Sequence, residues 1–282
     1  MATNEAFAPA KINLTLHVTG RRADGYHLLD SLVVFADLGD RLWLDPGAQM
    51  SLEVSGPFAD GVPRDDSNLV WRAAMAAGWR GAIRLEKNLP HGAGIGGGSA
   101  DAAALLRALH GDDAMRVIGP EATLALGADV PVCLHTGPQR MRGIGEQLTR
   151  LGQSVPRLFA VLVNPGVHVP TPQVFKALTC RDNPDMTPMP ERPDRQTFLS
   201  WLADQRNDLQ AAAITQAPVI KEVLAALTAT SGCALARMSG SGATCFGLYA
   251  TRDQAARATR DIAASNAGWW VRSVITCGRD IS

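Results

Sequence analysis

The feature that most constrains this chain is a glycine-rich segment followed directly by a helical pattern. Five of the residues 92–98 are glycines, and the Ala- and Leu-rich residues 99–110 that follow predict a helix ended by Gly111. Glycine lets backbone N–H groups approach a ligand with no Cβ in the way, and a helix N-terminus adds unpaired N–H donors and a partial positive charge. The segment therefore predicts a phosphate-binding loop, with a plain glycine-rich connection as the alternative.

The composition excludes several classes of protein. Lys plus Arg and Asp plus Glu both number 27, so the formal net charge is zero and no general nucleic-acid-binding surface is expected. The five cysteines are scattered without a C-x-x-C pair, which predicts reduced thiols rather than a disulfide framework or zinc site. The sequence shows neither a signal peptide nor an apolar run of the roughly 20 residues that cross a membrane. We therefore expect a cytoplasmic protein with no membrane partner.

Strands and helices follow one another irregularly along the chain. Apolar and polar residues alternate over residues 12–19, which predicts a half-buried strand, and Ser67 is a predicted helix N-cap. Residues 130–137 (VPVCLHTG) predict another strand, and residues 184–193, with four prolines, predict a linker. Mixed elements without a regular βα repeat favour an α+β fold over a doubly wound sheet.

Two ionisable residues are candidates for chemistry. Lys11 and Asn13 are predicted to lie on the same face of the first strand, and Asp129 lies among apolar neighbours just before residues 130–137. The residues alone leave their functions open. A lysine on a polar strand face is ordinarily solvated, and an aspartate before an element ordinarily caps or turns the chain.

The glycine spacing admits more than one phosphate ligand. Gly92, Gly94 and Gly97 match G-x-G-x-x-G, the pattern of dinucleotide-binding oxidoreductases. Such a loop needs an acidic residue about 20 positions on, at the end of a second strand. Residues 116–123 (RVIGPEAT) do not form such a strand, and the Gly-Lys-Ser/Thr ending of a P-loop is also missing. An oxidoreductase stays an alternative that the context disfavours.

Three segments, in this order, resemble the GHMP kinase family. They are APAKINLTL around Lys11, a P-x-x-x-G-[LI]-G-x-G-S-A loop over residues 90–100, and RMSGSGATCFGLY near the C-terminus. We call residues 90–100 the glycine loop. The resemblance implies an α+β, two-domain GHMP kinase fold with the active site in the interdomain cleft. Residues 1–152 would form the ATP-binding N-terminal domain, and residues 153–282 the C-terminal domain.

Further segments narrow the resemblance to family members whose alcohol substrate carries a cytidine diphosphate group. These segments are AKINLTLHVTGRRADGYHLLDSL, GADVPVCL, RGIGEQLTRL, NPGVHVPTPQVF and RNDL. The resemblance implies ATP-dependent phosphorylation of the 2-hydroxyl of cytidine diphosphate methylerythritol, in the non-mevalonate route to isoprenoid precursors. It also implies Mg²⁺ as a cofactor and a monomer or weak homodimer. A kinase for another alcohol and a non-catalytic nucleotide-binding protein stay as alternatives.

The resemblance assigns the transfer step to Asp129 and Lys11. Asp129 would accept the hydroxyl proton, and Lys11 would lie beside it and stabilise charge on the transferred group. Asn68 would contact the adenine, and Ser99 would contact phosphate or magnesium, with the other metal ligands left open. The ATP-binding residues expected in the glycine loop are Pro90, His91, Gly92, Ala93, Gly94, Ile95, Gly96, Gly97, Gly98, Ser99 and Ala100.

The resemblance assigns substrate recognition to five residues. Tyr26 and Phe175 would stack on the cytosine, and the backbone of His27 would bind its edge. Asn13 would hold the substrate, and Thr171 would contact the methylerythritol end.

The sequence departs from the family pattern at three positions in two segments. Ala100-Asp101 stands where many relatives have Ser-Asn, and Ser241 replaces a frequent Thr. The first change places a carboxylate close to the expected triphosphate site. We therefore expect the side chain of Asp101 to point away from the triphosphate or to assist magnesium.

Overall fold

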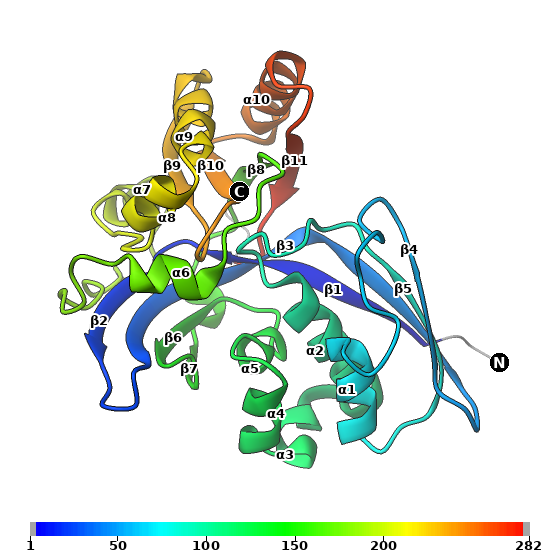
Figure 1. Cartoon of the computed structure of the whole chain (residues 1–282). Coiled ribbons are helices and arrows are strands. Elements are labelled where there is room, and N and C mark those ends of the chain that lie inside the picture. Colours follow the sequence, from blue (N-terminus) through cyan, green and yellow to red (C-terminus); the bar gives the residue numbers. More distant parts are fainter. Residues whose placement is uncertain (1–3, 279–282) are drawn as a thin grey trace. The chain divides into compact units, whose positions relative to one another are not determined.

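The computed structural model describes residues 4–278, and the outermost residues of the two predicted domains, 1–3 and 279–282, lie outside this range (Figure 1). The described chain forms two compact units. Unit 1 consists of residues 4–11, 38–91 and 96–136, and unit 2 of residues 12–37, 92–95 and 137–278. Each unit consists of segments that are not contiguous in sequence, and two strands, β1 (Asn4–Asn13) and β3 (His27–Pro46), have residues in both units. The division of this chain into an N-terminal domain of residues 1–152 and a C-terminal domain of residues 153–282 stays a prediction.

Unit 1 combines strands with a group of helices. Besides parts of β1 and β3, its strands are β4 (Ser51–Ser55) and β5 (Gly81–Glu86). Strand β5 pairs antiparallel with β3 and parallel with β4, and in β4 only the alternate residues Leu52 and Val54 are buried. The helices are α1 (Leu69–Ala76), α2 (Gly97–His110), α3 (Ala114–Ile118), α4 (Pro120–Leu126) and α5 (Val130–Cys133), with a 3₁₀ turn at Gly111–Asp113. Helix α2 packs against α1 and α5.

Unit 2 contains a four-stranded antiparallel sheet in the order β11-β8-β10-β9 (Figure 1). Its strands are β8 (Phe159–Asn164), β9 (Cys233–Met238), β10 (Cys245–Tyr249) and β11 (Trp270–Ile275). Helices α9 (Val219–Ala229) and α10 (Arg252–Ser265) pack on this sheet. The central β8 is buried along nearly its whole length, which explains its continuous apolar run.

The remaining elements of unit 2 include three strands that belong to the same sheet as the first part of β3. Strand β2 pairs antiparallel with β3, as does β6, which in turn pairs with β7. These strands are β2 (His17–Arg21), β6 (Gln139–Gly143) and β7 (Gln147–Arg150). The helices are α6 (Thr171–Lys176), α7 (Arg195–Ala203) and α8 (Gln210–Gln216), with a 3₁₀ turn at Gly152–Ser154. Antiparallel pairing predominates throughout, and the α+β prediction is confirmed.

Three local predictions need correction. The predicted strand over residues 12–19 is interrupted, because β1 ends at Asn13 and β2 begins at His17. The N-cap of α1 is Asn68, not Ser67, whose hydroxyl donates to Asp65 instead. Residues 130–137 contain the short helix α5 and not a strand. Pro131 fits the first turn of a helix, where its missing N–H has no intrahelical partner.

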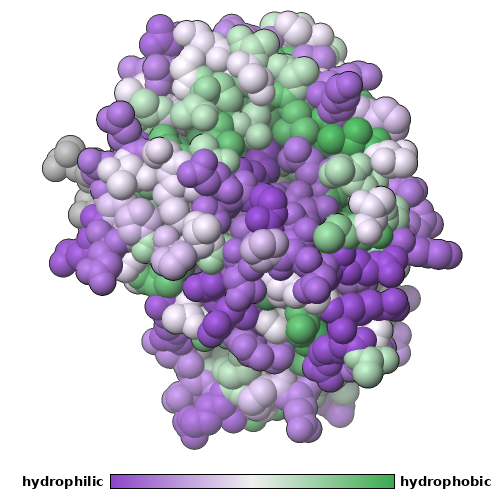
Figure 2. Space-filling model, turned by 90° about the vertical axis from the view of Figure 1, so that its left-hand side faces the viewer, coloured by the Kyte–Doolittle hydropathy of each residue, from purple (hydrophilic) through white to green (hydrophobic). Residues whose placement is uncertain are grey.

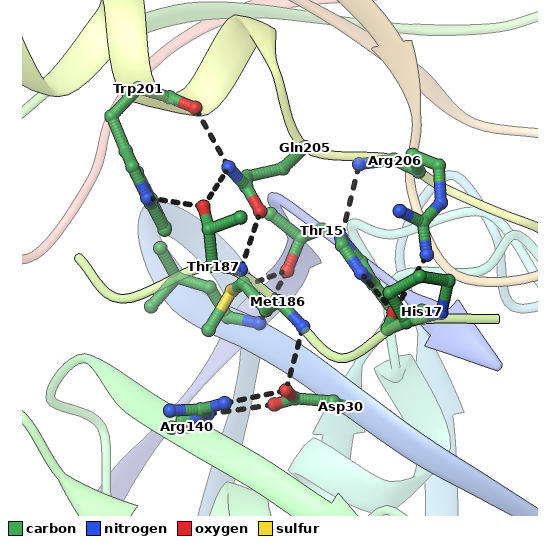
Figure 3. Close-up of polar contacts among 11 residues, drawn as sticks. Thr15, His17, Asp30, Arg140, Met186, Thr187, Trp201, Gln205 and Arg206 are labelled. Atoms are coloured by element: carbon green, nitrogen blue, oxygen red, sulfur yellow. Dashed lines mark hydrogen bonds and ion pairs between the residues drawn. The ribbon is translucent and has the colours of Figure 1, made fainter. Parts of the chain in front are cut away.

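The proline-rich residues 184–193 do not link the two units, since both ends of this segment belong to unit 2. Met186 is buried, its N–H donates to Asp30 at 3.0 Å, and Arg140 binds the same carboxylate (Figure 3). Thr187 bonds the amide of Gln205 in the same region (Figure 3). These contacts bind the segment to β3 and to the residues after α7. The prolines therefore stiffen a packed connection and do not make a free linker.

Arg237 on β9 is the main buried cation of unit 2. Its guanidinium donates to the carbonyl oxygens of Leu14 at 2.9 Å, Leu202 at 3.0 Å and Gln205 at 2.7 Å. Burial lowers the pKa of Arg237 to about 10, so the side chain stays protonated at neutral pH. The side chain thus joins β9, the end of α7 and the residue that follows β1.

We expect Arg237→Met to destabilise the protein strongly, because the buried carbonyls of Leu14 and Gln205 lose their donor, while that of Leu202 keeps the N–H of Gln205. Each carbonyl left without a donor costs about 1–3 kcal/mol, so a loss of about 2 kcal/mol or more is expected. In a protein of this size, each kcal/mol lowers Tm by about 2–4 °C, which differential scanning calorimetry resolves. The control is Arg116→Met, which removes an exposed ion pair with Asp113. Equal Tm values for the two variants would contradict this account of Arg237.

The surface is of mixed polarity. On the face in Figure 2, hydrophobic residues gather in patches mainly in the upper part, and hydrophilic residues cover most of the rest. Within the described residues, no helix combines the length and the apolar character needed to span a bilayer.

Candidate active site

The glycine loop leads into α2 through left-handed backbone conformations. Gly92, Gly94 and Gly96 have φ values of +56°, +74° and +67°. Gly96 is the N-cap of α2, and helical geometry begins at Gly97, two residues earlier than predicted. The first N–H groups of a helix have no intrahelical acceptors, so this end of α2 can donate to an anion. The helix ends at Gly111, as predicted.

Lys11 and Asp129 form an ion pair in unit 1, with Nζ 2.8 Å from Oδ1. The side chain of Lys11 is 4% exposed and that of Asp129 is 36% exposed, so the carboxylate remains accessible from solvent. Asp129 is the N-cap of α5 and makes no side-chain capping bond, which leaves its carboxylate to Lys11. The structure therefore brings together the two residues that the sequence analysis assigned to the transfer step.

The same ion pair lies at the start of α2. A Cβ placed on Gly96 would be only 3.2 Å from Cβ and Cε of Lys11, so the glycine backbone packs directly on the lysine stem. A Cβ on Gly127, two residues before Asp129, would be 3.6 Å from Oγ of Ser99. Ser99, Lys11 and Asp129 thus surround a helix N-terminus, an arrangement that suits a phosphate group.

Asp101 does not point into this site. Its carboxylate is buried and accepts from Nζ of Lys87 at 2.6 Å, and Lys87 also binds Asp40. We call Asp40, Lys87 and Asp101 the Lys87 cluster. Burial raises the pKa of Asp101 to about 8, against the opposing charge of Lys87. Burial by itself would lower the pKa of Lys87, but the two carboxylates outweigh it and raise this pKa.

Asn68 acts as a helix cap. Its Oδ1 accepts from the N–H of Val70 at 2.9 Å, and its Nδ2 donates to the carbonyl of Pro63 at 2.7 Å. Both ends of the side chain are therefore engaged within unit 1. The adenine contact stays a prediction, for which the second N–H of Nδ2 and the second lone pair of Oδ1 are left.

Asn13 in unit 2 has an unused acceptor. Its Nδ2 donates to the hydroxyl of Ser31 at 2.8 Å, while its buried Oδ1 has no hydrogen-bond partner among the described residues. Its backbone N–H donates to Oγ of Ser239 at 3.1 Å, and that hydroxyl donates to the carbonyl of Gly94 at 3.0 Å. We call residues 237–249 (RMSGSGATCFGLY) the C-terminal glycine-rich segment. Its Ser239 joins Asn13 to the glycine loop.

The predicted cytosine-binding residues gather around α6 and the β2–β3 turn. The rings of His27 and Phe175 stack, with centroids 4.8 Å apart and planes 23° apart. Burial lowers the pKa of His27, and the charges of Arg21 and Arg181 lower it further, so its imidazole is neutral at pH 7. Tyr26 is 62% exposed in the turn. Tyr26 precedes the stacked His27 in the chain, and an exposed aromatic ring is a surface on which a flat base could bind.

Thr171 begins α6 and contacts the C-terminal glycine-rich segment. Its hydroxyl lies 2.7 Å from the hydroxyl of Ser241, and either one can be the donor. The serine that replaces threonine at position 241 therefore still carries the hydroxyl that makes this contact.

Sequence reasoning missed two features of the site. It assigned only the backbone of His27, whereas the ring of this residue stacks on Phe175. It also missed the Lys87 cluster, although a charged Asp101 within an Ala-rich helix was a signal that could have prompted a search for a buried partner.

The dinucleotide alternative fails on topology. In unit 1 the chain leaves α2 into α3, α4 and α5, and the next strand is β6. A dinucleotide-binding loop requires the helix to return to a neighbouring parallel strand that ends in an acidic residue. The G-x-G-x-x-G match is therefore incidental.

Comparisons with known proteins agree with this geometry. The pattern of the GHMP kinases N terminal domain matches residues 68–137, and that of the GHMP kinases C terminal family matches residues 191–267. A 4-diphosphocytidyl-2-C-methyl-D-erythritol kinase of Cereibacter sphaeroides is 57% identical over 95% of this chain and 97% of its own length. The enzyme of that name from Paracoccus denitrificans is 57% identical over 94% of this chain and 93% of its own.

Solved structures give the same result. A crystal structure of 4-(cytidine 5'-diphospho)-2C-methyl-D-erythritol kinase matches with a TM-score of 0.76 and 35% identity, covering 97% of this chain and 99% of that chain. A homoserine kinase from Cytophaga hutchinsonii, 18% identical, shares the fold with a TM-score of 0.66 over 97% of this chain and 95% of that chain. This chain belongs to the GHMP kinases and, within them, to the family of 4-diphosphocytidyl-2-C-methyl-D-erythritol kinases.

Proposed function

We propose that the chain transfers the γ-phosphoryl group of ATP to the 2-hydroxyl of 4-diphosphocytidyl-2-C-methyl-D-erythritol, giving the 2-phosphate and ADP. This step belongs to the non-mevalonate route to isoprenoid precursors. The observation that carries the proposal is the Lys11–Asp129 ion pair at the N-terminus of α2, in a chain of this family. The pair supplies an accessible carboxylate and a fixed cation beside a helix end suited to phosphate.

The proposed transfer step is a single displacement. The substrate hydroxyl oxygen bonds to the γ-phosphorus of ATP while the bond to the bridging oxygen breaks and ADP leaves. The hydroxyl proton passes to Asp129, and Lys11 stabilises negative charge on the moving group. A carboxylate is a weak base toward an alcohol, so the proton moves late, as the phosphoryl group loosens. Catalysis then depends mainly on positioning and charge stabilisation.

Magnesium fits this site as a partner of the nucleotide. Within the described residues, no group of three or more His, Cys, Asp or Glu side chains could hold a metal ion. Mg²⁺ commonly needs only one or two protein ligands, with triphosphate oxygens and water completing its shell. The hydroxyl of Ser99 is the oxygen donor at the start of α2 that would hold it. When bound, Mg²⁺ would neutralise part of the triphosphate charge.

Recognition of the second substrate is assigned to unit 2. The unpaired Oδ1 of Asn13 is a buried acceptor for a substrate hydroxyl, and Thr171 offers a hydroxyl to the methylerythritol end. Tyr26 would stack on the cytosine beside the His27–Phe175 pair. The unpaired cysteines, all five of which are described, suit a cytoplasmic enzyme. We expect it to act as a monomer or weak homodimer.

Tyr26→Ala tests the cytosine assignment. Loss of one base–aromatic stack costs about 1–3 kcal/mol, so KM for the cytidine substrate should rise by roughly 5- to 150-fold. KM for ATP should stay unchanged, because Tyr26 would contact the cytidine substrate and not ATP. Phe7→Ala removes another exposed aromatic, which packs under Arg41 in unit 1, and serves as the control. A less than twofold change in KM for the cytidine substrate would remove Tyr26 from recognition.

A further inference from the structure

The Lys87 cluster joins the two ends of the glycine loop. On the side that enters the loop, Oδ1 of Asp40 accepts from the backbone N–H groups of Asn88 and Leu89, the latter at 2.9 Å. On the side that leaves the loop, Asp101 lies in the second turn of α2 and accepts from Lys87. Lys87, immediately after β5, bridges the two carboxylates. One ammonium group thus connects the residues before the loop with the helix after it.

The cluster also lies directly behind the start of α2. A Cβ placed on Gly97, the first helical residue, would be 3.6 Å from Nζ of Lys87 and 3.8 Å from Oδ2 of Asp40. All three side chains of the cluster are buried. The cluster therefore cannot touch a nucleotide at the outer side of the loop, and any effect on the nucleotide must act through the backbone.

Burying an ammonium and two carboxyl groups is energetically costly, and stability alone does not require it. Well-packed apolar side chains in place of a buried ion cluster are often as stable or more stable. What the cluster supplies instead is directional bonding, since an ammonium between two carboxylates fixes the separation of three backbone segments. Asp101 even keeps one buried carboxylate oxygen without a hydrogen-bond partner in the described structure. The cluster therefore fixes the geometry of these backbone segments at a cost in folding free energy.

We propose that Asp40, Lys87 and Asp101 are positioning residues of the kinase reaction: they fix both ends of the glycine loop so that its N–H groups keep the geometry that binds the triphosphate. The inference rests on the proposed function, in that the loop is taken to bind ATP. It adds three residues that act through the loop and not on the substrate.

Asp101→Ala and Asp101→Asn test the proposal. Alanine removes the acceptor of Lys87 at the helix, while Lys87 keeps Asp40 as its partner. The bond lost is charge-assisted, so KM and Kd for ATP should rise about fivefold or more. KM for the cytidine substrate should stay unchanged. Asparagine keeps an oxygen that accepts from Lys87 and should restore the ATP values to within about twofold of the wild type.

Asp40→Asn provides a second route to the same result. Its amide can still accept from the N–H of Leu89, but then presents NH₂ instead of an oxygen to Lys87. Its KM for ATP should therefore also rise about fivefold or more. If Asp101→Ala fails to fold, this variant decides the question. The control is Asp30→Asn in unit 2, which removes a buried carboxylate bound to Arg140 and should lower Tm without a selective change for ATP.

ATP binding is measured by isothermal titration calorimetry, beside steady-state kinetics and Tm. A selective loss of ATP affinity in Asp101→Ala and Asp40→Asn, with rescue in Asp101→Asn, supports the proposal. Folded variants that lose Tm but keep the wild-type ATP affinity would show that the cluster is only structural. A wild-type protein that binds no ATP would instead overturn the proposed function, so the two failures are distinguishable.

Discussion

Asp129→Asn is expected to lower kcat by about 10²- to 10⁴-fold, the usual contribution of a positioned proton acceptor. The amide is almost the same size as the carboxylate but cannot take the hydroxyl proton. It also removes the negative partner 2.8 Å from the buried ammonium of Lys11. ATP binding should persist, because the helix N-terminus and the glycine loop are unchanged. Single-turnover kinetics and calorimetric titration of ATP measure the two effects separately.

The control for this variant is Asp113→Asn, which removes an exposed ion pair with Arg116 in the same unit. Such surface pairs contribute roughly 0–1 kcal/mol, so kcat and Tm should both stay near the wild-type values. A folded Asp129→Asn protein with wild-type kcat would remove Asp129 from the transfer step. Loss of ATP binding together with kcat would instead point to a structural function for the ion pair.

Gly94→Ala is expected to damage both folding and ATP binding. Gly94 has a φ of +74°, and an added Cβ would lie 2.5 Å from the carbonyl oxygen of Ser239 and 2.8 Å from that of Gly242. Left-handed strain costs about 1–2 kcal/mol, and overpacking against rigid backbone adds about 1–3 kcal/mol. The loop must shift, so Kd for ATP should rise while Tm falls.

Gly61→Ala separates the steric clash from the strain. Gly61 has a nearly equal φ of +77°, but an added Cβ would meet nothing within 4 Å. In this variant the free energy of unfolding should fall only by the about 1–2 kcal/mol that the left-handed strain costs, and the ATP affinity should stay at the wild-type value. Calorimetry of both variants gives the comparison. Equal losses of Tm, with ATP affinity intact in both, would contradict the close packing of Gly94 on the C-terminal glycine-rich segment.

Local signals in the sequence predicted the parts of the site that depend on local structure. Glycines followed by an Ala- and Leu-rich run predict a loop and a helix, and α2 ends at Gly111 as expected. The short apolar run over residues 130–137 misled, because periodicity cannot distinguish a short buried strand from a helical turn. Asp129 was predicted to precede a strand, and in the structure it precedes the short helix α5 instead.

Contacts between distant residues could not be predicted from patterns. Lys87 binds Asp40, which is 47 residues away in the sequence, and Asp101, which is 14 residues away. Asn13 is hydrogen-bonded to Ser239, which is 226 residues away. Nothing local to Lys87 distinguishes a buried bridge from a solvated strand end. The pairing of Lys11 with Asp129 followed only from the resemblance to a family, since neither residue by itself indicates the other.

The most direct test of the proposed function is ADP release from Mg-ATP with 4-diphosphocytidyl-2-C-methyl-D-erythritol, measured beside homoserine, mevalonate and galactose. The proposal predicts turnover with the cytidine compound alone, with one ADP formed for each phosphate ester produced. Turnover with another alcohol would retain the Lys11–Asp129 site but contradict the cytosine assignment. Absence of turnover with every alcohol, in a protein that binds ATP, would contradict the proposal that this chain is an active kinase.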